Sequence, residues 1–162
     1  MAPIPHRNDL IYYSTKTWEH VVSAAFRQPL AKSHCRHTHG YGLTVKATFG
    51  AFELDPNNWV VDFGALKSFK EKMEEQFDHK LLVCNDDPAK HALQAHQAEF
   101  GDMNIRIVWA VGCEAFSRLL FEMLEEWLDV HQYTPRVWVE QVEVSEHSGN
   151  SAITASRVGR SL

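Results

Sequence analysis

The loop Ser33–Gly40 gathers residue types that could do chemistry. It holds Cys35 together with three of the chain's ten histidines, and Arg36 follows the cysteine directly. A cysteine acts as a nucleophile or a base when neighbouring imidazole or cationic groups favour its thiolate. We therefore interpret Cys35 as a candidate catalytic residue.

Two histidines of this loop, His37 and His39, stand two residues apart. In an extended chain, side chains at this spacing point to one face, a geometry that suits two imidazole ligands of Zn²⁺. Polar loops also contain such pairs by chance, so the local sequence leaves both interpretations open.

Asp78 and His79 could form a pair in which the carboxylate orients the imidazole. They follow the last apolar residue of a predicted helix, and adjacent residues of a helix do not face each other. The pair therefore requires that the chain has left the helix. Otherwise His79 is a helix-end residue that interacts with the helix dipole.

Two glutamates are candidates for ligand binding. Glu146 ends a predicted strand just before the turn Ser148–Asn150. Its carboxylate could accept two N–H bonds from a guanidine-like edge of a ligand, or could be a solvated charge that protects a sheet edge. Glu114 is expected in the first turn of a helix behind a cap at Gly112 or Cys113, where a negative charge favours the dipole.

The elements that must position these residues follow from hydrophobic periodicity. Residues 41–49 alternate between apolar and polar, as a half-buried strand does, and residues 63–77 repeat at steps of three and four. The pattern predicts strands over 18–26, 41–49, 103–109, 137–144 and 152–158, and helices over 63–77, 115–127 and, as a short piece, 89–99. This order predicts an α+β layer, an antiparallel sheet covered on one face by two helices.

Composition bounds the class of protein. The chain has 162 residues, 44% of them hydrophobic, and a net charge of −5, which predicts a single domain (1–162, core about 18–158) and argues against nucleic-acid binding. It has no apolar run long enough for a membrane span and no apolar leader at its start. Three cysteines without disulfide spacing favour a reducing, cytoplasmic setting.

Taken in chain order, these motifs resemble those of the 6-pyruvoyl-tetrahydropterin synthase / 6-carboxy-tetrahydropterin synthase family. The run Val61–Lys67 followed by Asp78–His79 is the most specific part. The matching segments are Ser23–Pro29, Cys35–Tyr41, Val60–Lys67, Phe77–Leu82, Glu114 and Val144–Glu146. The resemblance implies a tunnelling fold with a four-stranded antiparallel sheet and two helices, assembled as a homo-oligomer, a hexamer or trimer-based ring, with active sites at subunit interfaces.

The same resemblance implies roles for the candidate residues. Cys35 would transfer protons at the substrate side chain, assisted by Asp78 with His79, often from a neighbouring subunit. Glu146 would anchor the pterin ring, with Glu114 as a second substrate-binding candidate. The implied activity is that of a lyase acting on 7,8-dihydroneopterin triphosphate in pterin or 7-deazaguanine (queuosine-type) biosynthesis.

The family binds zinc through three histidines, and here the sequence departs from the pattern. Two of the three places hold Phe26 and Tyr41, and of the three ligands only His39 remains. Either His37, with Cys35, His20 or His34, completes a different zinc site, or the metal has been lost. We favour loss, because one imidazole does not hold catalytic zinc and an aromatic pair packs well in a sheet. A non-catalytic pterin- or purine-binding homologue and a structural assembly protein are the alternatives to the enzyme.

Overall fold

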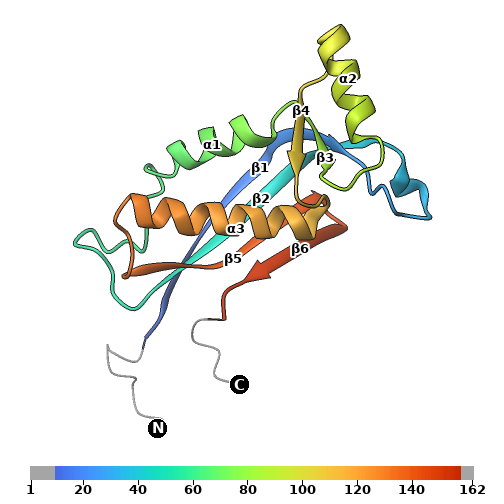
Figure 1. Cartoon of the computed structure of the whole chain (residues 1–162). Coiled ribbons are helices and arrows are strands. Elements are labelled where there is room, and N and C mark those ends of the chain that lie inside the picture. The colour runs from blue at the N-terminus through green and yellow to red at the C-terminus, as the bar shows by residue number, and fades with distance from the viewer. Residues whose placement is uncertain (1–9, 158–162) are drawn as a thin grey trace.

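The computed structural model describes residues 10–157, which form one curled sheet with helices packed on it (Figure 1). Its elements are, in chain order, β1 (Tyr12–Phe26), a one-turn 3₁₀ helix (His34–Arg36), β2 (His39–Ala51), α1 (Lys67–Phe77), β3 (Lys80–Cys84), α2 (Lys90–Phe100), β4 (Ile105–Val108), α3 (Cys113–Val130), β5 (Val137–His147) and β6 (Asn150–Ala155).

The predicted α+β class is confirmed, but the prediction of a four-stranded antiparallel sheet is wrong. The described part of the chain forms a six-stranded sheet in the order β4-β3-β1-β2-β5-β6. Strands β1, β2, β5 and β6 pair antiparallel as expected, whereas β3 runs parallel to both β1 and β4. Strand β3 was not predicted because it is a five-residue, mostly apolar run, and periodicity does not identify such short runs.

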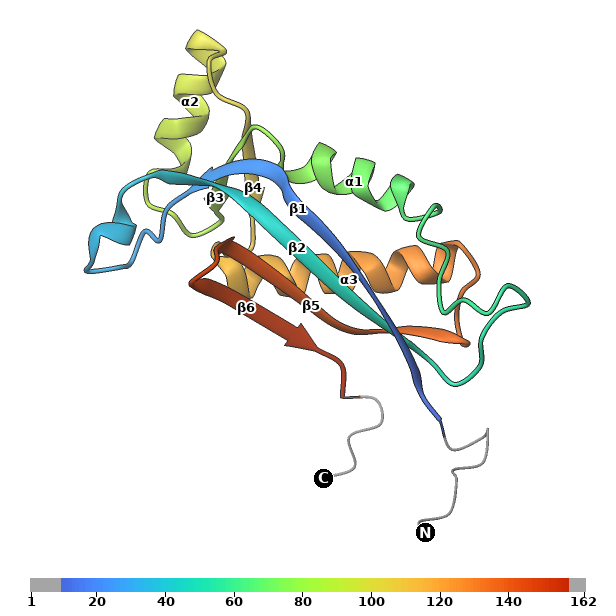
Figure 2. The ribbon, with the colours of Figure 1, turned by 180° about the vertical axis from the view of Figure 1, so that it is seen from behind.

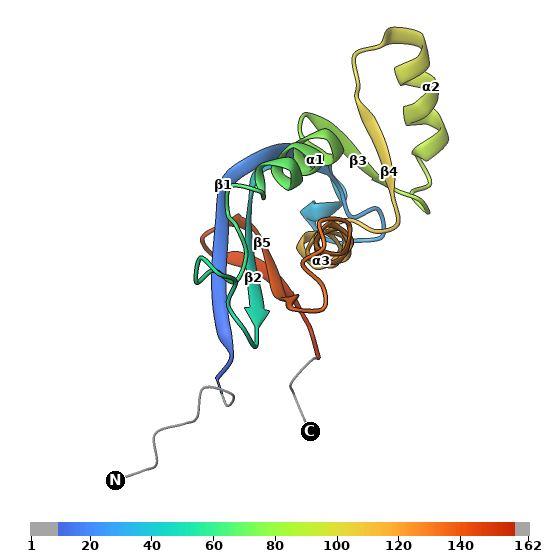
Figure 3. The same ribbon diagram turned by 90° about the vertical axis from the view of Figure 1, so that its left-hand side faces the viewer.

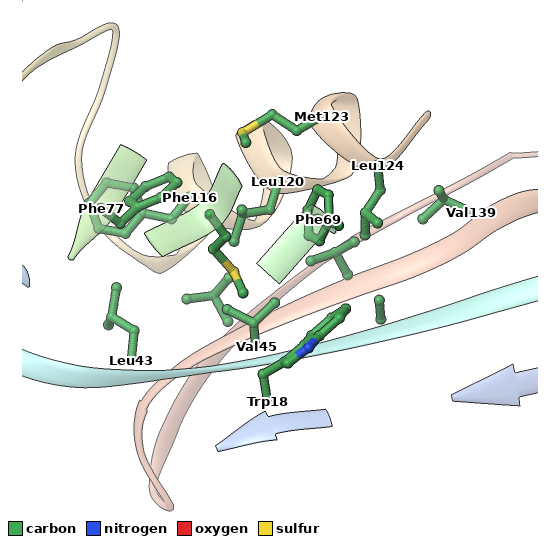
Figure 4. Close-up of a cluster of buried hydrophobic side chains, with 14 of the residues drawn as sticks. Trp18, Leu43, Val45, Phe69, Phe77, Phe116, Leu120, Met123, Leu124 and Val139 are labelled. Carbon is green, nitrogen blue, oxygen red and sulfur yellow. The ribbon is translucent and has the colours of Figure 1, made fainter. Parts of the chain in front are cut away.

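Helices α1 and α3 cover the same face of the sheet, as Figure 3 shows. The alternation of β2 turns Leu43 and Val45 toward them, and both side chains are buried. Phe116 and Leu124 of α3 and Phe69 of α1 close the layer from above, with no more than 1% of any of them exposed (Figure 4). Burying this apolar stripe between helix and sheet is the main source of stability for such a layer.

Several element boundaries differ from the predicted ones. Helix α1 begins at Lys67 rather than Phe63, because the Asp62 carboxylate accepts a hydrogen bond from the Gly64 N–H (2.7 Å) and holds the preceding residues in a turn. Strand β1 begins at Tyr12, six residues before the predicted start, and these added residues pair with the far half of β2. The end of the last predicted strand, residue 158, and the start of the chain lie outside the described residues.

The predicted short helix near residues 89–99 is confirmed as α2, which projects away from the sheet (Figure 2). An ion pair between Arg27 at the end of β1 and Asp87, with N–O distances of 2.6 and 2.9 Å, fixes the connection that leads into it. Among the described residues, no helix has the length and apolar character needed to cross a membrane.

Candidate functional site

Three rings meet where β1 ends and β2 begins. Phe26 and His39 are partners in the antiparallel ladder, and Tyr41 pairs with Ala24 two residues along, so their side chains share one face of the sheet. The ring centroids lie 5.2 Å apart for Phe26–His39, 5.4 Å for His39–Tyr41 and 6.1 Å for Phe26–Tyr41. Phe116 of α3 packs edge-on against Phe26 at 5.1 Å, which closes the cluster from the core side.

This triangle has the size of a three-imidazole zinc site but not its donors. With Zn–N bonds of about 2 Å in a tetrahedron, three imidazole rings would have centroids about 5 Å apart. Phe26 has no lone pair to donate, so of the two ladder partners only His39 brings a nitrogen. Within residues 10–157, no three His, Cys, Asp or Glu side chains lie together in a way that could hold a metal ion. The residues present do not fit a catalytic zinc.

The structure does not place His37 beside His39 on one strand face. Cys35 lies half-buried in the one-turn 3₁₀ helix, His37 is the cap that ends this turn, and β2 begins only at His39. The strand that would place both imidazoles on one face therefore does not reach back to His37. The two histidines interact instead through the backbone, because the Nδ1 atom of His39 lies 2.7 Å from the His37 carbonyl oxygen. A carbonyl only accepts, so Nδ1 carries the proton and Nε2 of the neutral ring keeps a lone pair.

The phenol of Tyr41 connects two of the candidate residues from different elements. Burial, followed by the charges of Glu146, Cys35 and Cys113, raises the pKa of Tyr41 above its usual value near 10. The hydroxyl is therefore protonated at neutral pH, and it lies within electrostatic range of both the candidate thiol and the candidate anchor. The ring also contacts His147 at the end of β5, at a centroid distance of 6.3 Å.

Glu146 lies close to the N-terminus of α3. Burial, the negative charges of Glu146 and Glu114, and a hydrogen bond to Glu146 raise the pKa of Cys113 to about 12. At neutral pH the thiol therefore stays protonated and can donate to the Glu146 carboxylate. The cap of α3 is Gly112, and Glu114 lies in the first turn, as predicted.

Asp78 and His79 form a hydrogen-bonded pair, which is one of the two arrangements that the sequence left open, because the chain has left the helix. Asp78 caps α1 in an extended conformation and His79 has a φ of 52°. The His79 ring donates from Nδ1 to the Asp78 carboxylate (2.8 Å), and the backbone N–H of Ser23 donates to its other oxygen (2.7 Å). The hydrogen bond from Ser23, then the one from His79, lowers the pKa of Asp78.

The contacts described for this pair involve none of the other candidate residues. The side chain of His79 is 83% exposed, and the contacts described for it and for Asp78 lead to Ser23 on β1. In a single chain, Cys35 and Glu146 both lie within electrostatic range of Tyr41, and the His79 ring faces solvent.

The sequence pointed to Tyr41 only as a residue in the place of a metal ligand, and to Cys113 only as a possible helix cap. Cys113 is buried, and its contact with Glu146 has no sequence signal, because the two residues lie on different elements. The alternation of side chains along β2 places Tyr41 on the same face as His39 and Leu43. This alternation could have identified Tyr41 as a residue of the site.

Sequence comparisons identify related proteins. The chain matches the family model described as 6-pyruvoyl tetrahydropterin synthase over residues 15–157. It is 23% identical over 130 residues, 80% of each chain, to a 6-carboxy-5,6,7,8-tetrahydropterin synthase of Aquifex aeolicus. It is 33% identical to one of Rickettsia typhi over 57 residues, 35% of this chain and 41% of that protein.

Two solved structures share the fold. An uncharacterized protein of Wolinella succinogenes superposes with a TM-score of 0.76 at 22% identity, over 90% of this chain and 98% of that chain. The 6-pyruvoyl tetrahydropterin synthase of Plasmodium falciparum superposes with a TM-score of 0.60 at 16% identity, over 89% and 98% of the two chains.

Proposed function

Since this chain belongs to the 6-pyruvoyl tetrahydropterin synthase family, we propose that it is a tetrahydropterin synthase-like lyase acting on 7,8-dihydroneopterin triphosphate. The pathway would be pterin or 7-deazaguanine (queuosine-type) biosynthesis. The observation that carries the proposal is the convergence of Cys35 and Glu146, from the 3₁₀ turn and from β5, on the phenol of Tyr41. A thiol for proton transfer and a carboxylate for ring recognition thus both lie within electrostatic range of one group.

Glu146 would anchor the pterin. An ionised carboxylate accepts two parallel N–H bonds from an aminopyrimidine edge, which fixes both the position and the orientation of the ring. The Cys113 thiol, kept protonated by its raised pKa, hydrogen-bonds to this carboxylate and holds it in place.

Cys35 would transfer protons at the substrate side chain. In its thiolate form it takes a carbon-bound proton, so that a C–H bond breaks and an S–H bond forms, and it returns the proton in a later step. Asp78 holds His79 with Nδ1 protonated, which leaves Nε2 of the neutral ring free to accept a second proton. Because the His79 side chain is 83% exposed and none of the contacts described for the pair reaches Cys35, we propose that the pair serves the site of a neighbouring copy in a homo-oligomeric ring.

No step is assigned to zinc, because the donors at the three-ring cluster do not fit it. That same cluster supports a second candidate function, binding of a pterin or purine without turnover. Phe26 fills one of the three positions with a side chain that is 2% exposed and makes no polar contact.

The test is incubation of the purified full chain with 7,8-dihydroneopterin triphosphate, with a chelator and with added zinc, and separation of the products by chromatography. Turnover in the presence of chelator, lost in Cys35→Ala, supports the lyase. Binding without product supports the second candidate. Absence of binding in a folded protein contradicts both.

A further inference from the structure

His39 and Tyr41 present an acceptor and a donor side by side. The Nδ1 proton of His39 is used by the His37 carbonyl (2.7 Å), which leaves the lone pair on Nε2. Among residues 10–157, no side chain or backbone group makes a hydrogen bond to the Tyr41 hydroxyl. The two rings lie 5.4 Å apart, nearly perpendicular at 81°, and both are half-buried.

The packing around the two rings holds these groups in place. Phe26 contacts both rings, and Phe116 in turn packs on Phe26. His147 contacts Tyr41 from the end of β5. Polar groups on rings that are already fixed lose little conformational entropy when a ligand binds, so such a pair is suited to recognition.

We propose that His39 and Tyr41 bind the hydroxylated side chain of the pterin directly. The Tyr41 hydroxyl donates to one side-chain oxygen, and His39 Nε2 accepts from a neighbouring hydroxyl. The inference rests on the proposed function and adds the chemistry of the ligand: a side chain with adjacent hydroxyls, recognised without a metal. Glu146 and Cys35 both lie within electrostatic range of Tyr41, and the proposal directs the pterin ring toward Glu146 and the side chain toward Cys35.

The test compares two ligands, each measured without and with a chelator. One is 7,8-dihydroneopterin, which has the hydroxylated side chain, and the other is 6-methyl-7,8-dihydropterin, which lacks it. We expect the folded full chain to bind the hydroxylated ligand at least tenfold more tightly. Tyr41→Phe keeps the ring packing and removes only the hydroxyl, so it should weaken binding of the hydroxylated ligand by about tenfold and leave the methyl ligand unchanged. His39→Phe should show the same selective loss.

Tyr133→Phe is the matched control, because Tyr133 stacks on Trp127 (5.4 Å) and not on the three-ring cluster. It should change neither affinity. Equal binding of both ligands by the wild type, unchanged in Tyr41→Phe, would overturn this inference and leave pterin binding intact. Loss of the preference on adding the chelator would overturn it in favour of a metal. Binding of neither ligand would remove the proposed function as well.

Discussion

Phe26 and His39 face each other across the β1–β2 ladder with their ring centroids 5.2 Å apart. The chemistry of these two side chains determines whether a metal ion can bind at this end of the sheet. One partner is an apolar ring that is 2% exposed, and the other has a single free nitrogen. Phe26, His39 and Tyr41 therefore have the spacing of a three-histidine metal site, but two of them lack the imidazole nitrogen that would bind the metal.

The double substitution Phe26→His with Tyr41→His should therefore create zinc affinity. It completes three imidazoles on a triangle whose sides measure 5.2, 5.4 and 6.1 Å, close to the spacing a tetrahedral site needs. We expect about one zinc per chain after dialysis, measured by elemental analysis. The wild type and the single variant Tyr41→His, dialysed in parallel, should retain much less. A folded double variant that holds no more zinc than the wild type would show that the triangle is not a metal geometry.

The same cluster should matter for stability. Phe26→Ala removes a buried ring that packs against Phe116, and large-to-small changes of this kind cost about 3–5 kcal/mol of unfolding free energy. Denaturant unfolding followed by tryptophan fluorescence measures the change. The control is Phe100→Ala on α2, where the ring is 61% exposed; its cost should stay within about 1 kcal/mol. Equal effects of the two substitutions would contradict the close packing of Phe26 in the core.

Much of this arrangement could be predicted from the sequence, since it depends on local patterns. The alternation of β2 and the helical period of α1 determine which of their residues face the core. The last apolar residue of the helical pattern, directly before Asp78, indicated the end of α1. The contact between Glu146 and Cys113 could not be predicted, because it joins the end of β5 to the start of α3, two elements that only the folded chain brings together. Nor could β3, whose place in the sheet is set by its parallel neighbours β1 and β4.

The ion pair between Arg27 and Asp87 should contribute to stability in a pH-dependent way. The hydrogen bond from Arg27 lowers the pKa of Asp87, whose side chain is only 2% exposed. A lowered carboxyl pKa stabilises the fold above the ordinary Asp value of about 3.9, and this contribution is lost as the pH falls through the folded-state value. Asp87→Asn should therefore cost about 1–3 kcal/mol at pH 7, and the cost should shrink toward pH 3.

The control for this measurement is Glu122→Gln, which breaks the surface pair with Arg118. That pair has a similar N–O distance, 2.9 Å, but its side chains are 72% and 58% exposed. Exposed pairs contribute about 0–1 kcal/mol, so the control should have little effect at either pH. A cost for Asp87→Asn that does not change with pH would show that Asp87 acts through packing rather than through its charge.

Alkylation of the cysteines tests the contact between Glu146 and Cys113 without any ligand. The thiolate is the reactive form, and the negative charge of Glu146 helps to raise the pKa of Cys113 to about 12. Glu146→Gln removes that charge, so it should lower the pKa of Cys113 and increase its alkylation rate at about pH 9. At this fixed pH, the thiolate fraction of Cys113 and its alkylation rate should rise roughly tenfold for each unit by which its pKa falls. Mass spectrometry of the labelled peptides measures the rate at each cysteine.

Cys84 serves as the internal reference in the same sample. It is as buried as Cys113, at 8% against 7% exposed, but its pKa is raised by burial and by Asp86 rather than by Glu146. Its rate should therefore not respond to Glu146→Gln, whereas general loosening of the fold would speed both cysteines together. A selective increase at Cys113 places the Glu146 carboxylate against the thiol at the start of α3. No increase at either cysteine would remove Cys113 as the group that holds the proposed pterin anchor.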